Sequence, residues 1–181
     1  MALLAIPTLE TPRLILRGYE ESDAPAIARM HGNAEVVHFL GGETDDSLRG
    51  AWDHIAFAMG HWAFKGYGKW AAVERASGRL IGRIGFLNPP YDWPGLELGW
   101  VLARDAWGKG YATEGARAAL DWGFSNIASD TILSIIREGN DASIRVAERL
   151  GETLQSAGIF HEKPCKIFGI TRDAWRKQAR T

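Results

Sequence analysis

Apolar residues occupy every second position of the segment 96–102, and Glu97, Gly99 and Val101 lie between them. A period of two is typical of a strand whose two faces meet different surroundings. The segment is therefore predicted to be a half-buried strand. Glu97 is expected on the face opposite to that of its apolar neighbours.

A glycine-punctuated turn follows this strand. Gly108 and Gly110 flank Lys109, and small residues recur beyond them as far as Ala119. The pattern predicts a helix that begins at Gly108 and extends to about Asn126.

The rest of the chain alternates between strand patterns and helical patterns. Apolar residues at helical spacing predict a helix from Asp46 to about Phe64, and Ser22 with Pro25 marks the start of a shorter helix that ends near His31. Further strands are predicted at 13–17, 70–74, 80–87, 131–136, 153–159 and 163–170, and further helices at 140–150 and 172–179. Strands interleaved with helices in this order predict an α/β (α+β) mixed sheet. No linker or repeat divides the sequence, so residues 1–181 are expected to form a single domain.

Composition narrows the class of protein without defining a function. A chain of 181 residues with 46% hydrophobic and 24% charged residues is typical of one globular domain. The net charge of −1 gives no reason to expect a nucleic acid or a membrane as partner. Cys165 is the single cysteine, which fits a reducing compartment, and the apolar N-terminus is a poor signal peptide. The cytoplasm is therefore the expected location.

The glycine turn that follows the strand 96–102 suits an anionic ligand. Glycines let backbone N–H groups approach a ligand closely, and a helix N-terminus adds unpaired N–H donors and the positive end of the helix dipole. Together these features bind a pyrophosphate well. The turn is not a P-loop, because no GK(S/T) ending follows, and the third glycine of a Rossmann fingerprint would fall at Thr113. The alternative is a tight turn that only packs the helix closely on the sheet.

The sequence of this turn resembles a known family. Asp105–Gly110 is similar to the acyl-CoA-binding signature (Q/R)xxGx(G/A) of the GNAT acetyltransferase superfamily, with Asp105 in place of the usual Gln or Arg. The version WGKGYATEG is similar to the branch that contains the bacterial ribosomal-protein N-terminal acetyltransferases. Residues 140–151 resemble that branch's NxxSxxxxEKLG helix, with Glu152 where an aromatic residue is usual, and residues 11–17 resemble its first strand.

The resemblance covers most of the chain from about residue 11 to 170. It implies a GNAT-like fold, in which helices flank a central, mostly antiparallel twisted sheet of six to seven strands. It also implies that the sheet is splayed at the strand 96–102.

The resemblance implies acetyl-CoA as the acetyl donor, with CoA as product and no metal. Backbone amides of the turn would bind the diphosphate, and Asn140 would contact the pantetheine arm. Val101 would donate its backbone N–H to the thioester carbonyl. The implied cofactor-binding residues are Trp100, Val101, Leu102, Trp107, Gly108, Lys109, Gly110, Tyr111, Ala112, Asn140 and Ser143. A solvated loop lysine is the alternative for Lys109, and a simple helix N-cap is the alternative for Asn140.

Acetyl transfer to an amine needs a neutral amine, a stabilised carbonyl oxygen and a proton for the leaving thiolate. The resemblance implies that Glu97 removes the amine proton through ordered water; a solvated sheet residue or an ion pair with an arginine is the alternative. The resemblance implies that Ser143 lies near the thiol and returns a proton to the thiolate through a water. The tyrosine that many members of the superfamily use as this acid is missing, because no tyrosine follows Tyr111. Cys165 has no neighbouring base in sequence, so direct transfer in a ternary complex is expected.

The resemblance implies that the acceptor binds between the first helices and the loop before the Glu97 strand. Acidic groups there would attract a cationic amine and aromatic groups would suit an apolar flank, although ordinary surface exposure explains each equally well. The candidates are Glu35, His38, Phe39, Tyr91 and Trp93. His54 and His61 share a helix face two turns apart, a spacing that does not suggest metal ligands.

Three functions remain open on the sequence. The first is an N-acetyltransferase acting on a small amine or amino-acid-like metabolite, for which a closed pocket is predicted. The second is an acetyltransferase of a protein N-terminus, such as that of a ribosomal protein, for which an open groove is predicted. The third is a non-catalytic acyl-CoA-binding sensor, which the presence of Glu97 beside the glycine turn disfavours. A monomer and a homodimer both fit the sequence.

Overall fold

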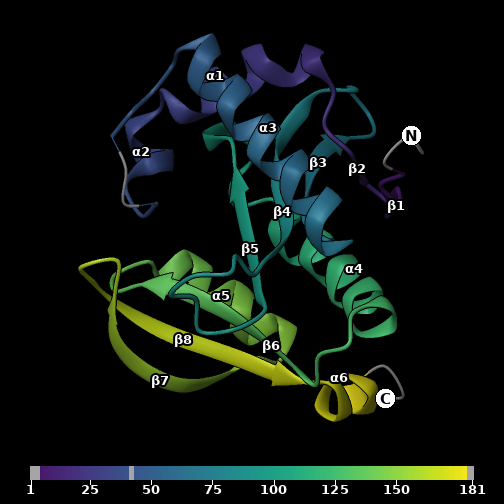
Figure 1. The fold of residues 1–181 in the computed structure, drawn as a ribbon, viewed down its shortest axis with the longest axis vertical. Helices are drawn as coiled ribbons and strands as arrows, with labels where there is room; N and C mark the ends of the chain where they lie inside the picture. Colours follow the sequence, from purple (N-terminus) through teal and green to yellow (C-terminus); the bar gives the residue numbers. More distant parts are fainter. Residues whose placement is uncertain (1–4, 41–42, 179–181) are drawn as a thin grey trace.

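The computed structural model describes residues 5–40 and 43–178. Eight strands form one sheet in the order β1-β2-β3-β4-β5-β6-β8-β7 (Figure 1). The strands are β1 (Leu9–Glu10), β2 (Leu14–Arg17), β3 (Lys69–Glu74), β4 (Leu80–Leu87), β5 (Glu97–Leu102), β6 (Thr131–Arg137), β7 (Thr153–Phe160) and β8 (Lys163–Thr171). The helices are α1 (Ala24–His31), α2 (Ala34–Val37), α3 (Leu48–Lys65), α4 (Tyr111–Asn126), α5 (Asp141–Leu150) and α6 (Arg172–Gln178), with short 3₁₀ turns at Glu21–Asp23 and Arg104–Ala106.

The mixed, mostly antiparallel sheet is confirmed, but its predicted size of six to seven strands is wrong. The additional strand is β1, which pairs with β2 through Leu9 and Glu10. Two residues are too few to show a period of two, so the pattern of the sequence could not reveal this strand. The pair β5 and β6 runs parallel, and the other pairs of neighbouring strands are antiparallel.

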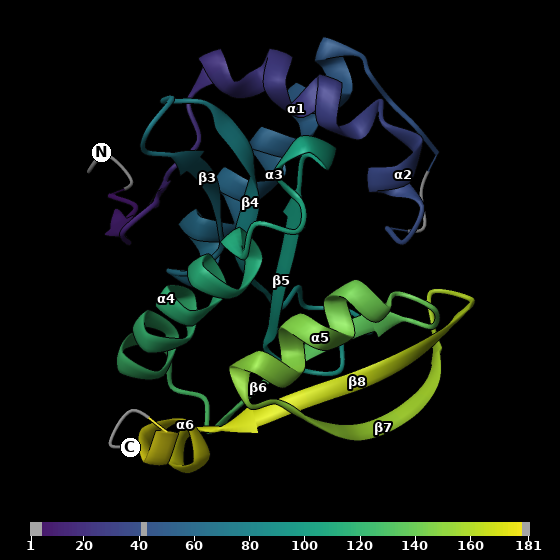
Figure 2. The same ribbon diagram turned by 180° about the vertical axis from the view of Figure 1, so that it is seen from behind.

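Helices cover both faces of the half of the sheet that precedes β6. The helices α1 and α3 lie on one face of this half and α4 lies on the other, while α5 packs beside α4 on β6 and β8 (Figure 2). On the α4 side, the strand residues Trp70 and Ile84 are completely buried in the largest core cluster. Alternation along the strands separates these residues from Lys69, Arg83 and other side chains of the α3 face. Within residues 5–40 and 43–178, no helix is both long and apolar enough to span a membrane.

Several predicted helix boundaries shift by a few residues. The helix predicted from Gly108 begins at Tyr111, because Gly108 and Gly110 have φ of 73° and 82°, which a right-handed helix does not continue. The helix predicted from Ser22 begins at Ala24, after a 3₁₀ turn. The helix predicted from Asp46 begins at Leu48, where the side chain of the N-cap Ser47 accepts from the Gly50 N–H.

The last predicted helix is present from Arg172 to Gln178. Its predicted final residue, Ala179, lies outside the described residues. Asn140 and Gly151 bound α5 as expected, since Asn140 caps its N-terminus and Gly151 adopts the left-handed conformation at its C-terminus.

Candidate active site

The parallel strands β5 and β6 separate almost as soon as they meet. Their pairing consists of Glu97 opposite Leu133, with a 2.8 Å hydrogen bond from the Leu133 N–H to the Leu96 carbonyl. On its other side, β5 pairs with β4 along its whole length. The two strands diverge in Figure 1, so the half of β5 beyond Leu98 has one edge without a neighbouring strand. The splay predicted at this strand is present.

A buried hydrogen bond connects β5 and β6 at the point where they separate. The Ser134 hydroxyl lies 3.0 Å from the Leu98 carbonyl and 3.0 Å from Oε1 of Glu152, and both side chains are buried. One hydroxyl has a single proton, so it donates to both partners at once only in a shared, weakened geometry. If Glu152 is protonated, its O–H donates to Ser134 and Ser134 donates to Leu98. Burial raises the pKa of Glu152 to about 8, which favours this protonated arrangement.

The open edge of β5 carries particular backbone groups. Leu96 and Leu98 direct their carbonyls toward β6, whereas the Val101 carbonyl lies close to Gly82 of β4. Backbone groups alternate along a strand. The N–H groups of Trp100 and Leu102 therefore lie on the open edge, and that of Val101 lies on the β4 side.

The glycine turn leads from this edge to the start of α4. A Cβ placed on Gly108 would meet nothing within 4 Å, so the backbone there borders open space. Gly110 is the N-cap of α4, and no side chain caps this helix. The first N–H groups of α4, beginning at Tyr111 and Ala112, are thus those that a helix leaves without an internal partner. These are the groups for which anion binding is predicted.

Ion pairs hold the turn in place. Arg13 donates to the Lys109 carbonyl at 2.8 Å and pairs with Glu114 at 2.6 Å. Asp105, which replaces the residue usual in the family signature, pairs with the exposed Arg79 at 2.8 Å. Lys109 is exposed, and its backbone carbonyl, not its ammonium group, connects the turn to Arg13.

A group of side chains lies where β5 meets the start of α5. It consists of Trp100, Ser143 and Asn140. The Trp100 indole N–H donates to the Ser143 hydroxyl at 3.3 Å, and the Asn140 side chain accepts from the Ser143 N–H at 3.2 Å. Trp100 also packs on the cluster formed by Ile136, Ala147 and Phe168. Because the Ser143 oxygen accepts from Trp100, its own proton remains available to another acceptor.

Glu97 lies at the vertex of the splay and faces the side of α3. A Cβ on Gly99 would lie 3.5 Å from the Glu97 Oε1, which shows that both positions share this face. Burial raises the pKa of Glu97, and the nearby cations Lys69 and Arg83 oppose this rise together with the indole of Trp93. Its Oε2 is shielded from solvent and makes no hydrogen bond within the described chain. A half-buried carboxylate of raised pKa is suited to accept a proton.

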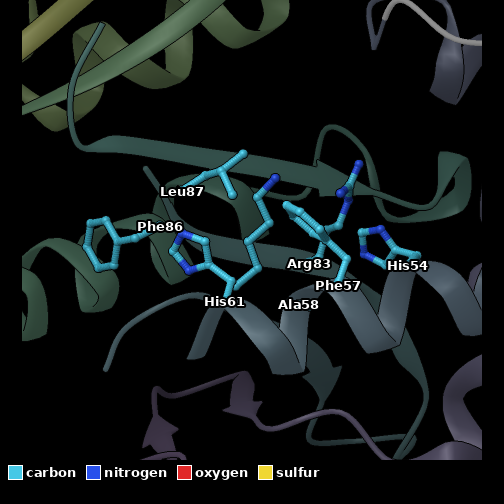
Figure 3. A pocket seen from close by; sticks show the side chains of 8 residues that line it. His54, Phe57, Ala58, His61, Arg83, Phe86 and Leu87 are labelled. Atoms are coloured by element: carbon cyan, nitrogen blue, oxygen red, sulfur yellow. The ribbon is translucent and has the colours of Figure 1, made fainter. Parts of the chain in front are cut away.

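A partly enclosed cavity of about 100 Å³ lies between α3 and the sheet, and Leu87, which lines it, pairs with Glu97 of β5. In Figure 3, His54 and Arg83 lie at one end of it, and His61 lies toward the other with Phe86. Lys69 also lines the cavity. Lys69 and Arg83 are not among the site residues predicted from the sequence, although Lys69 begins the strand KWAAVE and Arg83 interrupts the apolar strand LIGRIGFL.

The imidazoles around the cavity are neutral near pH 7. Burial and the neighbouring Arg83 lower the pKa of His54 to about 2 and that of His31 to about 4. Burial also lowers the pKa of His61, whose Nδ1 lies 2.8 Å from the Tyr67 carbonyl and whose Nε2 lies 3.2 Å from the Asn88 N–H. The described residues contain no group of three or more side chains suited to hold a metal ion.

The predicted acceptor residues do not gather in one place. Glu35 pairs with Arg104 at 2.8 Å, and Arg104 lies 4.8 Å from the ring of Trp107, so Glu35 is tied to the glycine turn. His38 stacks edge-on with Phe39 at 4.6 Å. Phe39 also reaches the loop before α5, where its ring lies 4.0 Å from a Cβ placed on Gly139.

The two predicted acceptor residues of the loop before β5 differ from one another. Tyr91 is 56% exposed. Trp93 is partly buried, packs edge-on against Phe160 at 4.9 Å and lines a more open hollow of about 380 Å³ beside β7 and β8. Of the five acceptor candidates, Trp93 is thus the one whose side chain acts on the pKa of Glu97, which it lowers.

The family comparison agrees with this geometry. The model of the acetyltransferase (GNAT) domain matches residues 13–153. YkkB of Bacillus subtilis (strain 168) is 33% identical over 164 residues, which is 88% of this chain and 93% of that protein.

Solved structures show the same fold. An acetyltransferase from Agrobacterium tumefaciens str. C58 superposes with a TM-score of 0.81 at 32% identity, covering 94% of this chain and 97% of its own. RimL, described as a ribosomal L7/L12 alpha-N-protein acetyltransferase in complex with coenzyme A, has a TM-score of 0.77 at 17% identity, with 93% and 99% covered. At that identity the second likeness shows the fold alone.

Proposed function

The chain belongs to the GNAT family of acetyltransferases, and from this premise we propose that it transfers an acetyl group from acetyl-CoA directly to a small primary amine. The observation that carries the proposal is the open edge of β5, which connects two features. At one end of the edge lies the N-terminus of α4, which follows the glycine turn and has no side-chain cap. At the other end lies Glu97. We take residues 1–181 as one catalytic domain, because a single sheet runs through the described chain.

The described residues fit acetyl-CoA at this edge. The amides from Gly108 to Ala112 would hold the diphosphate, since the space beside Gly108 is open and the helix dipole favours anions there. The edge of β5 at Trp100 and Leu102 would hold the pantetheine arm, together with the side chain of Asn140. Acetyl-CoA supplies a thioester whose carbonyl carbon accepts the amine. The alternation of β5 favours the Trp100 N–H as donor to the carbonyl oxygen, in place of the Val101 N–H implied by the family resemblance.

Glu97 is proposed to make the amine nucleophilic. An ammonium group has no lone pair, so Glu97 takes its proton, directly or through water, before the nitrogen attacks the carbonyl carbon. The carbon–sulfur bond then breaks, and sulfur leaves with the electron pair. The nitrogen gives up its second proton to water as the amide forms. The Ser143 hydroxyl, whose oxygen accepts from Trp100, is the proposed relay that passes a proton to the thiolate and takes one back from water.

A small amine is favoured over a protein N-terminus by the shape of the site. The cavity between α3 and the sheet is partly enclosed and holds about 100 Å³, much less than the roughly 300–1,000 Å³ usual for sites of drug-sized ligands. The larger hollow of about 380 Å³ lies between Trp93 and the strands β7 and β8. A protein N-terminus, the kind of acceptor that RimL is described as acetylating, is the second candidate because that hollow is open.

The test is a panel of amines with acetyl-CoA, in which release of the free thiol of CoA is followed. The panel contains small primary amines, amino acids and peptides with free N-termini. The proposal predicts thiol release with at least one class of small amine and little with the peptides. Release with peptides alone would support the second candidate, and no release with any amine would contradict acetyl transfer to amines.

A further inference from the structure

The cavity between α3 and the sheet contains more positive than negative charge. Lys69 and Arg83 line it, and the nearby imidazoles of His54 and His61 have lowered pKa values and are neutral near pH 7. Glu97 is the acidic side chain that acts on both cations. Two cations therefore face one carboxylate, and this carboxylate must also accept a proton if it serves as the base.

Neither cation has a close partner in the described part of the chain. Lys69 and Arg83 take part in no salt bridge and no side-chain hydrogen bond, in contrast to Arg17, which pairs with the buried Asp23 at 2.8 Å. The Arg83 Nε is shielded from solvent and makes no hydrogen bond there. Burial lowers the pKa of Lys69 to about 8. A shielded guanidinium N–H without an acceptor is costly, because the desolvated donor loses its hydrogen bond to water.

The register of the strands places Lys69 and Arg83 on the face of the sheet that carries Glu97. Arg83 lies opposite Ala71 in the β3–β4 pair, and Leu87, four residues along β4, lies opposite Glu97 in β5. Residues at even spacing share one face of a strand, so Arg83, Leu87 and Glu97 lie on the same face as the cavity. A molecule in the cavity can therefore contact the cations and present another group to Glu97.

We propose that Lys69 and Arg83 form a subsite for a carboxylate, so that the acceptor is an amino-acid-like molecule with a primary amine and a carboxylate. A guanidinium matches a carboxylate with two parallel hydrogen bonds, and the ammonium of Lys69 adds a second charge. The volume of about 100 Å³ suits a compact group of this kind. The inference rests on the proposed function, since it assigns the acceptor of the same site.

The experiment compares matched acceptors with acetyl-CoA. Each amino acid is assayed beside its primary amide and beside the amine that lacks the carboxylate, and thiol release is followed. For at least one amino acid, we expect kcat/KM to exceed that of both analogues by tenfold or more. Equal rates for the three partners would overturn the carboxylate subsite while leaving acetyl transfer intact. No release with any partner would overturn the proposed function, and this inference with it.

Two variants locate the effect. R83M and K69M should each raise KM for the amino acid by about 10- to 100-fold, the usual value of a hydrogen bond to a charged group, and change the amide's kinetics by less than about twofold. R49M is the control, because Arg49 is 91% exposed on α3. Thermal unfolding of each variant shows whether it is folded. In addition, the amino acid should raise the unfolding temperature of the unchanged protein and not that of R83M. An equal loss for the amide and the amino acid would contradict the assignment.

Discussion

Glu97 has the environment of a base, and its substitution tests that role at the level of one residue. It is half-buried with a raised pKa, and its Oε2 is shielded from solvent within the described chain. E97Q keeps the shape of the side chain and removes its ability to take a proton. We expect kcat to fall by about 10²- to 10⁴-fold, with acetyl-CoA affinity changed less than twofold. Steady-state kinetics and a binding titration measure the two quantities.

The matched control for E97Q is D53N, because Asp53 is a carboxylate 69% exposed on α3. D53N should retain the turnover of the unchanged protein. Unchanged turnover in E97Q would remove Glu97 from the mechanism. Loss of acetyl-CoA binding in E97Q would show that the residue acts on the donor and not on the acceptor.

Glu152 makes stability depend on pH in an unusual direction. Its pKa is about 8 in the folded protein and about 4.3 in an unfolded chain, so between these values only the folded state keeps the proton. The free energy of unfolding should therefore fall as pH rises from about 5 to 8, by about 1.4 kcal/mol for each unit separating the two pKa values. Below pH 4 this contribution is complete.

The measurement is urea unfolding of the protein and of E152Q from pH 5 to 9, in which one cooperative transition is expected for a single domain. E152Q does not titrate at this position, so its stability should fall less over this range. E148Q, at an exposed position on α5, should behave like the unchanged protein. An identical pH dependence in E152Q and the unchanged protein would show that Glu152 is ionised in the fold.

Backbone N–H groups of the turn before α4, and not a side chain, are proposed to bind acetyl-CoA. Gly108 and Gly78 offer a matched pair: φ is 73° and 68°, and a Cβ at either position would meet nothing within 4 Å. G108A and G78A should each lose a similar stability, on the order of 1 kcal/mol, because both place a side chain in the left-handed region. Only G108A should also lose acetyl-CoA affinity, by tenfold or more.

Tryptophan fluorescence follows acetyl-CoA binding in both glycine variants, since Trp100 and Trp107 border the proposed site. Urea unfolding gives their stabilities. Equal affinity in G108A and G78A would show that the glycine turn does not contact the donor. A large loss in G78A would show instead that binding responds to stability in general.

The same elements show what local sequence pattern can predict. The strand 96–102, the turn and the Asn140 cap depend on neighbouring residues, and each is present in the structure. The exact start of α4 was missed because left-handed φ values at glycine are decided by the turn's surroundings. A two-residue strand such as β1 carries no pattern of its own and is defined by its partner β2.

Across the molecule, the proposed acceptor site is the part that depends least on local sequence pattern. Lys69, Arg83 and Glu97 belong to three strands, and only the register of β3, β4 and β5 brings their side chains to one face. The candidates drawn from the first helices were not brought to Glu97, because Glu35 pairs with Arg104 instead. Their selection relied on position in the chain, whereas convergence depends on tertiary pairing.

Both proposals require that the splayed β5 edge and the start of α4 bind acetyl-CoA. Isothermal titration calorimetry of acetyl-CoA into the folded protein tests this requirement without depending on the identity of the acceptor. We expect saturable binding of one molecule per chain, weakened in G108A and retained in E97Q. Absence of heat at two temperatures, with a protein that still unfolds cooperatively, would contradict it.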